Sequence, residues 1–157
     1  MPYINKAQVT LIPALTSDFE ELVSLRIEAM RESLERIGRF DPIRARERFR
    51  AGFSALDTRH VILNDRRVGF VVVKPKEEHI LLDHLYIHPD FQQQGIGTAV
   101  LDEIFGEADA AGLPLHVGAL RGSDANLFYQ KHGFNLIEEE EWDIYYVRLP
   151  SIAHDAE

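Results

Sequence analysis

The sequence predicts a single α/β domain built on a mixed sheet, and three observations support this. The 157 residues, 45% hydrophobic and 27% charged, suit one globular domain with a real core. Segments with strand and helix patterns follow in the order strand, two helices, three strands, helix, strand, helix, two strands. The helix between the fourth and fifth strands makes a βαβ-type crossover. We expect the domain to cover residues 1–150, with a polar tail at 151–157.

The first half of the chain supplies one strand, two helices and a hairpin. A strand at 8–12 precedes residues 16–18, which offer N-cap and capping-box candidates for a helix that extends towards Gly38. Asp41-Pro42 is typical of the start of a second helix. The apolar anchors predicted for that helix are Ile43, Ala45, Phe49 and Phe53.

A hairpin and the second half of the chain complete the prediction. The hairpin joins 60–63 to 68–74 through a polar turn, and Gly69 predicts a bulge in its second strand. A strand at 80–87 ends at His88-Pro89, and the helix after it ends at Gly112. The remaining predictions are strands at 115–120, 135–137 and 144–149, a short helix at 126–132, and a solvated loop holding the glutamates 138–141.

Composition narrows the classes of function. A net charge of −9 argues against a general nucleic-acid binder, and no apolar run is long enough to span a membrane. The absence of cysteine excludes disulfides and thiol catalysis. The first six residues lack the apolar core of a signal peptide. We therefore expect a cytoplasmic protein, and the scattered histidines predict no metal site.

The stretch between the strand at 80–87 and the next helix is the strongest functional signal. A strand, a glycine turn and a helix N-terminus together aim backbone N–H groups at an anion. A P-loop is excluded because no lysine follows Gly97, and a dinucleotide fingerprint fails because position 100 is Val100. The alternative is an ordinary βα turn. What stands here is Gln92-x-x-Gly95-x-Gly97.

That pattern resembles the acyl-CoA pyrophosphate loop of the GNAT acetyltransferase superfamily, Gln/Arg-x-x-Gly-x-Gly/Ala. A second stretch, Ala125 to Phe134, is similar to one that these enzymes carry after their fifth strand. The resemblance implies a GNAT-like domain with a mixed, mostly antiparallel central sheet of about seven strands. It further implies a splay between strands 4 and 5 and helices on both faces. It is specific over residues 80–134 and matches elsewhere in element order.

The resemblance implies acetyl-CoA as co-substrate and direct transfer of the acetyl group to an amine of a small molecule or peptide. The pyrophosphate would be bound by the loop residues Gln92, Gln93, Gln94, Gly95, Ile96, Gly97 and Thr98. The pantetheine arm would add edgewise to Leu85, Tyr86 and Ile87. The N–H of Leu85 or Tyr86 is the expected oxyanion donor.

The catalytic assignments follow the same resemblance. Tyr129 occupies the position of the family's general acid, and tyrosine, with a reference pKa of ~10, is a proton donor at neutral pH. The alternative is a core tyrosine. Asn126 lies one helical turn earlier and is assigned to the CoA arm. The base is His84 or Asp83, which strand alternation puts on opposite faces; histidine is slightly preferred because it titrates near neutral pH.

Acceptor specificity is expected from the first two helices and the last hairpin. The candidates for substrate binding are Glu28, Arg31, Glu32, Trp142 and Tyr145. Acids with aromatic walls would hold an amine, whereas Arg31 or Arg39 would hold a carboxylate. For each of them the alternative is a solvated helix face or hairpin packing.

Two other hypotheses belong to different classes. One is a GNAT-fold module that binds acyl-CoA as a sensor or regulatory subunit with little turnover. The other is an unrelated nucleotide-binding α/β protein. A homodimer through the sheet edge or the last strands is compatible with the predicted fold.

Overall fold

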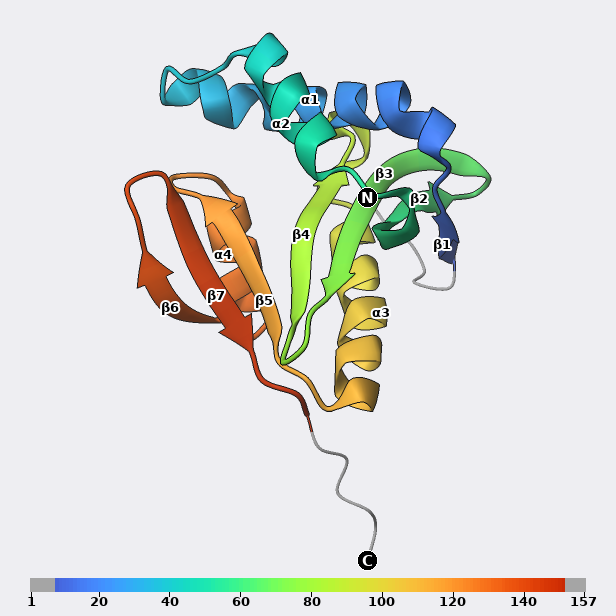
Figure 1. The fold of residues 1–157 in the computed structure, drawn as a ribbon, viewed down its shortest axis with the longest axis vertical. Coiled ribbons are helices and arrows are strands. Elements are labelled where there is room, and N and C mark those ends of the chain that lie inside the picture. Colours follow the sequence, from blue (N-terminus) through green and yellow to red (C-terminus); the bar gives the residue numbers. More distant parts are fainter. Residues whose placement is uncertain (1–7, 152–157) are drawn as a thin grey trace, which may run out of the picture. The chain divides into compact units, whose positions relative to one another are not determined.

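The computed structural model describes residues 8–151 and arranges them as seven strands and four α-helices (Figure 1). The strands are β1 Val9–Pro13, β2 Thr58–Leu63, β3 Arg66–Pro75, β4 Ile80–Ile87, β5 Leu115–Leu120, β6 Asn135–Glu139 and β7 Asp143–Arg148. The α-helices are α1 Phe19–Arg36, α2 Pro42–Gly52, α3 Ile96–Ala111 and α4 Ala125–Lys131. Three short 3₁₀ helices, η2 Thr16–Asp18, η3 Ala55–Asp57 and η4 Pro89–Phe91, lie in the connections.

The strands form one mixed sheet in the order β1-β2-β3-β4-β5-β7-β6. The pair β4 and β5 is parallel, and its register joins Ile80–Leu82 to Leu115–Val117. The pairs β1–β2, β2–β3, β5–β7 and β6–β7 are antiparallel. The element order and the mixed, mostly antiparallel sheet predicted from the sequence are therefore confirmed.

The described residues divide into two compact units. The first unit holds residues 8–72 and 84–100, and the second holds residues 73–83 and 101–151. Apart from Ser151, the predicted polar tail lies outside the described residues. Among the residues that are described, no helix is both long and apolar enough to cross a membrane.

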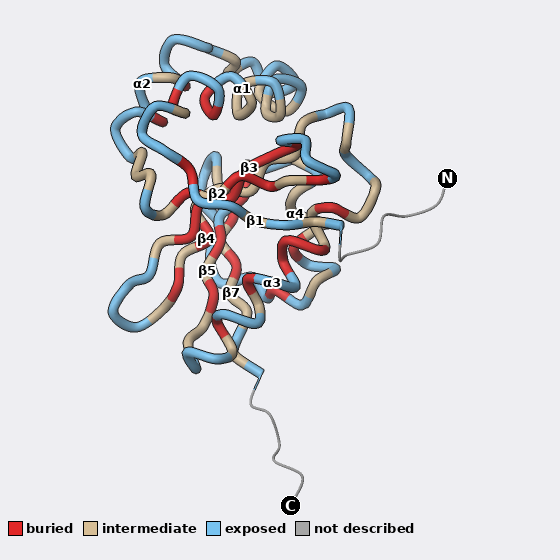
Figure 2. Tube along the Cα trace, turned by 90° about the vertical axis from the view of Figure 1, so that its right-hand side faces the viewer, coloured by how far each residue is buried: buried red, intermediate tan, exposed pale blue. Residues whose placement is uncertain are grey.

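The core of the first unit is aromatic. Phe49 lies 5.7 Å from Phe19 and from Phe70, and 5.8 Å from Phe53, between ring centroids. β3 is buried along most of its length (Figure 2). The residues of this core are Ala14, Phe19, Leu22, Val23, Phe49, Phe70 and Val72.

The core of the second unit packs α3 residues with α4 and its own strands. Phe134 lies 5.8 Å from Phe105 and 5.2 Å from Tyr129, between ring centroids. Arg148 on β7 donates to Asp109 on α3 at 2.9 and 3.2 Å. This ion pair holds the pKa of the Asp109 carboxyl below its ordinary value.

The predicted capping of α1 is wrong in detail. Asp18 precedes the helix, but its side chain makes no cap hydrogen bond. Its carboxylate instead accepts the Leu15 N–H at 2.8 Å and lies 2.8 Å from Nε2 of the fully buried His60. The Asp18 carboxylate thus contacts His60, a residue distant in sequence that no local pattern could identify. The cap of α2 is confirmed, because Asp41 accepts from the Arg44 N–H at 3.1 Å.

Two predictions about exposure and extent also need correction. Ile43 is 74% exposed and does not anchor α2, whereas Ala45 and Phe49 are buried as expected. The last hairpin is tighter than predicted, since Glu138 and Glu139 belong to β6 rather than to the loop. Both glutamates are exposed, so the expectation of a solvated acidic stretch holds.

Gly69 marks a bulge where β3 meets the end of β4. The register shifts there, because Val61 pairs with Gly69 but Ile62 pairs with Arg67. A Cβ at Gly69 would lie 2.3 Å from the Tyr86 carbonyl oxygen and 3.2 Å from Ile87 Cα. Only glycine permits so close a backbone approach.

We predict that Gly69→Ala lowers the free energy of unfolding by about 1–3 kcal/mol or more, as expected for an overpacked site. Gly106→Ala is the matched control. Gly106 lies in α3, and a Cβ added there would meet nothing within 4 Å, so alanine should stabilise the helix by roughly 0.5–1 kcal/mol. Urea unfolding gives the free energy of unfolding of both variants. Equal changes of the same sign would contradict the close approach of the β3 and β4 backbones at Gly69.

The Asp18–His60 contact predicts an acid-sensitive contribution to stability. The hydrogen bond with His60, followed by that from the Leu15 N–H, holds the pKa of Asp18 below its ordinary value. A depressed folded-state pKa stabilises the fold above the ordinary carboxyl pKa, and this is lost as pH falls through the depressed value.

Asp18→Asn should therefore lower the free energy of unfolding by about 1–3 kcal/mol at pH 7. The difference from the wild type should shrink as the pH falls below ~4, the ordinary range of an aspartate. Unfolding curves across this pH range measure it, with Asp65→Asn in the exposed hairpin turn as control. A difference that is constant with pH would refute the role of the Asp18 charge.

Candidate active site

The turn between β4 and α3 lies where the glycine pattern predicts it and contains two residues in the left-handed backbone region. The strand ends at Ile87, and η4 reverses the chain. Gln93 and Gly95 have φ of 62° and 88°, in the left-handed region. Gly95 bears this at no cost, and α3 begins at the next residue.

This geometry leaves backbone donors at the start of α3. Ala99 donates to Gly95 at 3.1 Å, and the amides of Ile96 and Gly97 precede that bond in the first turn of the helix. Gln92 and Gln93 are exposed, and Gly95, Gly97 and Thr98 are partly exposed. The Gln92 side chain donates to the Ile87 carbonyl at 2.9 Å and so fastens the turn to the end of β4. The turn has the features of an anion-binding site.

The two candidate bases on β4 have different surroundings. Asp83, in the second unit, lies 3.3 Å from the Lys74 ammonium. His84, in the first unit, has Nδ1 3.2 Å from the Tyr86 hydroxyl. The shared face of His84 and Tyr86 follows from strand alternation, as predicted.

Aromatic side chains surround His84. Its ring centroid lies 5.5 Å from Phe49, 6.4 Å from Phe70 and 5.4 Å from Tyr86. Because Tyr86 also packs against the buried aromatic core, the face of β4 that carries His84 is fixed by α1, α2 and β3 of the first unit. Leu85 and Ile87, which carry the predicted pantetheine contacts, alternate with these side chains and are partly buried.

Tyr129 on α4 is buried, at 5% exposure. Its ring lies 5.4 Å from Phe128, 5.2 Å from Phe134 and 6.4 Å from Tyr146, between centroids. These contacts fix the ring in the second unit. They are compatible with either a general acid or a core tyrosine, so the catalytic role stays a prediction.

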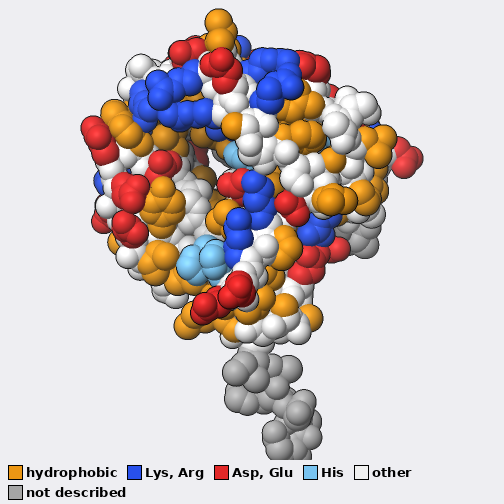
Figure 3. Space-filling view, in the orientation of Figure 1, with side chains coloured by type: hydrophobic (Ala, Val, Ile, Leu, Met, Phe, Trp, Pro, Cys, Tyr) orange, Lys and Arg blue, Asp and Glu red, His pale blue; other side chains and the backbone are white. Residues whose placement is uncertain are grey.

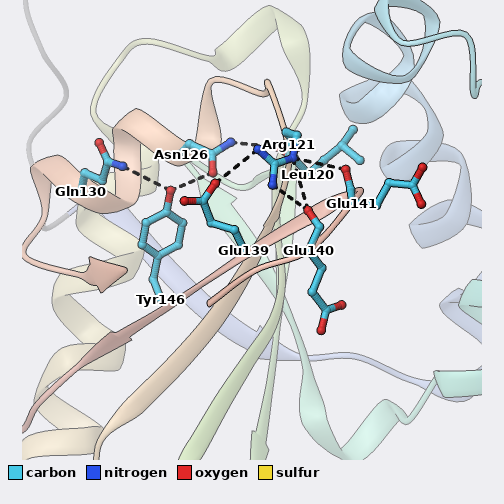
Figure 4. Close-up of polar contacts among 8 residues, drawn as sticks. All are labelled: Leu120, Arg121, Asn126, Gln130, Glu139, Glu140, Glu141 and Tyr146. Atoms are coloured by element: carbon cyan, nitrogen blue, oxygen red, sulfur yellow. Dashed lines mark hydrogen bonds and ion pairs between the residues drawn. The ribbon is translucent and has the colours of Figure 1, made fainter. Parts of the chain in front are cut away.

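Asn126 belongs to a polar network that supports α4 (Figure 4). Its Nδ2 donates to the Leu120 carbonyl at 2.8 Å, and its Oδ1 accepts from the Tyr146 hydroxyl at 2.8 Å. Gln130, one turn along, donates to the same hydroxyl at 3.3 Å. Asn126 thereby joins β5, α4 and β7, a structural task that the sequence did not indicate. Its predicted contact with the CoA arm stays a prediction.

Arg121, next to Leu120 in the chain, makes a second set of polar contacts with the β6–β7 turn (Figure 4). It donates to the main-chain carbonyl of Glu140 at 2.7 Å and to that of Glu141 at 3.2 Å. Its Nη1 also lies 3.3 Å from the Glu139 carboxylate. Arg121 therefore anchors the β6–β7 turn to the end of β5.

The acceptor candidates fall into two groups. On α1, Arg31 lies 3.3 Å from Glu28, and Glu32 lies 3.3 Å from Arg36, all at exposed positions. On the last hairpin, Trp142 is 40% exposed and Tyr145 packs beside Gly118. Burial, then nearby carboxylates, raises the pKa of Tyr145. Their substrate roles stay predictions.

Sequence reasoning did not single out Arg26, yet it lies in the first unit beside Tyr86. Its Cζ is 5.7 Å from the Tyr86 ring centroid. The available signal was its place on α1, where the residues three and four positions away are all apolar: Leu22, Val23, Ala29 and Met30. Among the residues described, no group of three or more potential ligands could hold a metal ion.

Comparison with known proteins agrees with this arrangement. Residues 57–136 match the family model described as an acetyltransferase (GNAT) domain. No curated protein matches the chain significantly.

Solved structures share the fold at low sequence identity. The PaiA N-acetyltransferase from Thermoplasma acidophilum, in complex with coenzyme A, is 18% identical, with a TM-score of 0.74 over 90% of this chain and 98% of that one. The ribosomal-protein-S18-alanine N-acetyltransferase from Escherichia coli is 18% identical, with a TM-score of 0.66 over 94% and 97%. The N-acetylglutamate synthase from Neisseria gonorrhoeae, complexed with coenzyme A and N-acetyl-glutamate, is 16% identical, with a TM-score of 0.65 over 91% of this chain and 35% of that one.

The sheet order, the left-handed turn before α3 and the family model over half of the sequence all agree: this chain belongs to the GNAT acetyltransferase family.

Proposed function

We propose that this protein is an acetyl-CoA-dependent N-acetyltransferase that acetylates a primary amine of a small molecule or peptide. The observation that carries the proposal is the left-handed turn at Gln93 and Gly95, which ends at the N-terminus of α3. Support comes from the coenzyme A complexes of the structurally similar Thermoplasma and Neisseria enzymes.

The turn would bind the diphosphate of the coenzyme. Amides that precede the helical ladder donate to its oxygens, and the helix dipole favours the negative charge. The side chain of Gln92 already bonds to the Ile87 carbonyl, so we assign it to holding the loop. The backbone of Gln93 to Gly97 would be the main source of donors.

The end of β4 would carry the pantetheine arm and polarise the thioester. The register of β4 with β5 covers Ile80–Leu82, at the start of the strand, and Leu85 to Ile87 lie beyond it. An amide-containing arm adds to such a strand through main-chain hydrogen bonds. The N–H of Leu85 or Tyr86 would stabilise the oxyanion that forms at the thioester carbonyl.

His84 is the better candidate for the general base. The Asp83 carboxylate lies 3.3 Å from the Lys74 ammonium, whereas His84 lies among aromatic rings with Nδ1 3.2 Å from the Tyr86 hydroxyl. Histidine is also the side chain whose ordinary titration range suits a base near neutral pH. His84 would take the proton of the attacking amine as the carbon–nitrogen bond forms. The carbon–sulfur bond then breaks, and Tyr129 would protonate the departing thiolate.

A second candidate function is acyl-CoA sensing with little turnover. The observation in its favour is the burial of Tyr129 among Phe128, Phe134 and Tyr146, which suits a structural residue as well as an acid. The two functions share the diphosphate turn and differ in whether an amine is consumed.

Calorimetry with acetyl-CoA tests the shared part. We expect binding to the wild type and at least about tenfold weaker binding to Gly95→Val, because a β-branched residue is strained at a φ of 88°. A panel of amines with a free-thiol readout then separates the functions. Thiol release marks the transferase, binding without release on any amine marks the sensor, and no heat with acetyl-CoA refutes both.

The general acid is tested with Tyr129→Phe, which keeps the ring contacts and removes only the hydroxyl. We expect kcat to fall by about 10²–10⁴-fold and the alkaline limb of its pH profile to disappear, with acetyl-CoA affinity unchanged. A Tyr129→Phe variant with the turnover and pH profile of the wild type would remove Tyr129 from the mechanism.

A further inference from the structure

Arg26 occupies the buried stripe of α1 rather than its solvent face. Leu22 and Val23, one turn before it, are 1% and 2% exposed. Met30 follows one turn later, so the arginine stands in the apolar row that faces the core of the first unit. An arginine at such a position is costly unless its charge has a partner.

The acidic residues of α1 do not supply that partner. All five of its glutamates pair with other arginines: Glu20 with Arg46, Glu21 with Arg67, Glu28 and Glu35 with Arg31, and Glu32 with Arg36. These pairs lie on exposed faces, and cationic side chains gather over α1 and α2 at the top of Figure 3. Arg26 is set apart from them by its position on the helix.

The guanidinium of Arg26 is also short of hydrogen bonds. Nε and Nη1 are enclosed by protein and have no hydrogen-bond partner among the described residues. The residue as a whole is partly exposed, so one side of it stays open to solvent. Native proteins rarely leave enclosed donors unsatisfied, and an exception indicates a ligand or a functional role.

The surroundings of this cation connect it with the candidate base. The Arg26 Cζ lies 5.7 Å from the Tyr86 ring centroid, and the Tyr86 hydroxyl lies 3.2 Å from His84 Nδ1. Arg26 and His84 therefore contact the same tyrosine, on one face of β4 in the first unit. A molecule whose amine reaches His84 would bring its neighbouring groups towards Arg26.

We infer that Arg26 binds the carboxylate of the acceptor, and that the acceptor is a small molecule carrying both an amine and a carboxylate. This inference rests on the proposed function and narrows its substrate class. A guanidinium presents a planar fork of donors that matches a carboxylate, and the apolar surroundings strengthen the ion pair. The carboxylate supplies the opposite charge that the glutamates of α1 do not.

Arg26→Met separates this role from a structural one. Methionine fills a similar apolar volume without charge, and removing an unpaired enclosed cation should leave the protein as stable as the wild type or more stable. Arg36→Gln is the matched control, because Arg36 lies on the same helix at an exposed position and is paired with Glu32.

The experiment compares amino acids with their carboxamides, which share the amine and differ only in the acid. The probes are the common L-amino acids and the corresponding amides, tested for transfer from acetyl-CoA and for a rise in melting temperature. For the wild type and Arg36→Gln, kcat/KM should favour the acid of the best pair by about tenfold or more, and only the acid should raise the melting temperature. For Arg26→Met, acid and amide should be equal, with acetyl-CoA affinity unchanged.

Acetyl transfer and the melting temperature together distinguish failure of the carboxylate site from failure of the proposed function. Amides that match or exceed the acids with the wild type, or an acid preference that survives in Arg26→Met, overturns the carboxylate site. A melting-temperature response to inorganic phosphate but to no amino acid overturns it as well. If no amine is acetylated, the proposed function fails, while the melting temperatures still decide whether Arg26 binds a carboxylate.

Discussion

The close approach of β3 to the end of β4 at Gly69 is the constraint on which the candidate site depends. Without a side chain at this position, the β3 backbone lies against the Tyr86 carbonyl and Ile87. The His88 N–H then donates to the Val68 carbonyl at 2.8 Å, which fixes the point where the strand ends. The turn, the start of α3 and the face of His84 and Tyr86 all take their positions from that point.

A second constraint is the uneven pairing of charge in the first unit. The glutamates of α1 meet arginines from α1, α2 and β3, so the exposed charges of the helix are locally balanced. Exposed pairs of this kind contribute little to stability. Arg26, whose Nε and Nη1 are enclosed without a hydrogen-bond partner among the described residues, stays outside this balance.

Much of the fold was predictable because its signals are local. Period-two and helical apolar patterns predicted the elements, Asp41-Pro42 marked the start of α2, and Gly95 and Gly97 marked the turn before α3. Asp18 was assigned wrongly because its partner, His60, is 42 residues away. The exposure of Ile43 likewise depends on which side of α2 meets the core, and the helix is too short for its pattern to decide this.

The site was less predictable than the fold. The glycine turn is recognisable from its sequence pattern. The hydrogen bonds of Asn126 to the Leu120 carbonyl and the Tyr146 hydroxyl, in contrast, depend on how β5 and β7 pack beside α4. Arg26 was missed because one charged residue in an apolar row is usually a long side chain that reaches solvent. Whether its nitrogens are enclosed depends on tertiary packing, which sequence periodicity does not contain.

The way Arg121 holds the β6–β7 turn has an evolutionary consequence. The arginine binds the carbonyl groups of Glu140 and Glu141 rather than their carboxylates, so every residue type offers it the same acceptors. Substitutions at these two positions therefore leave the carbonyl acceptors of Arg121 in place. A lineage could thus alter the chemistry displayed there by single substitutions, with no compensating change in the scaffold.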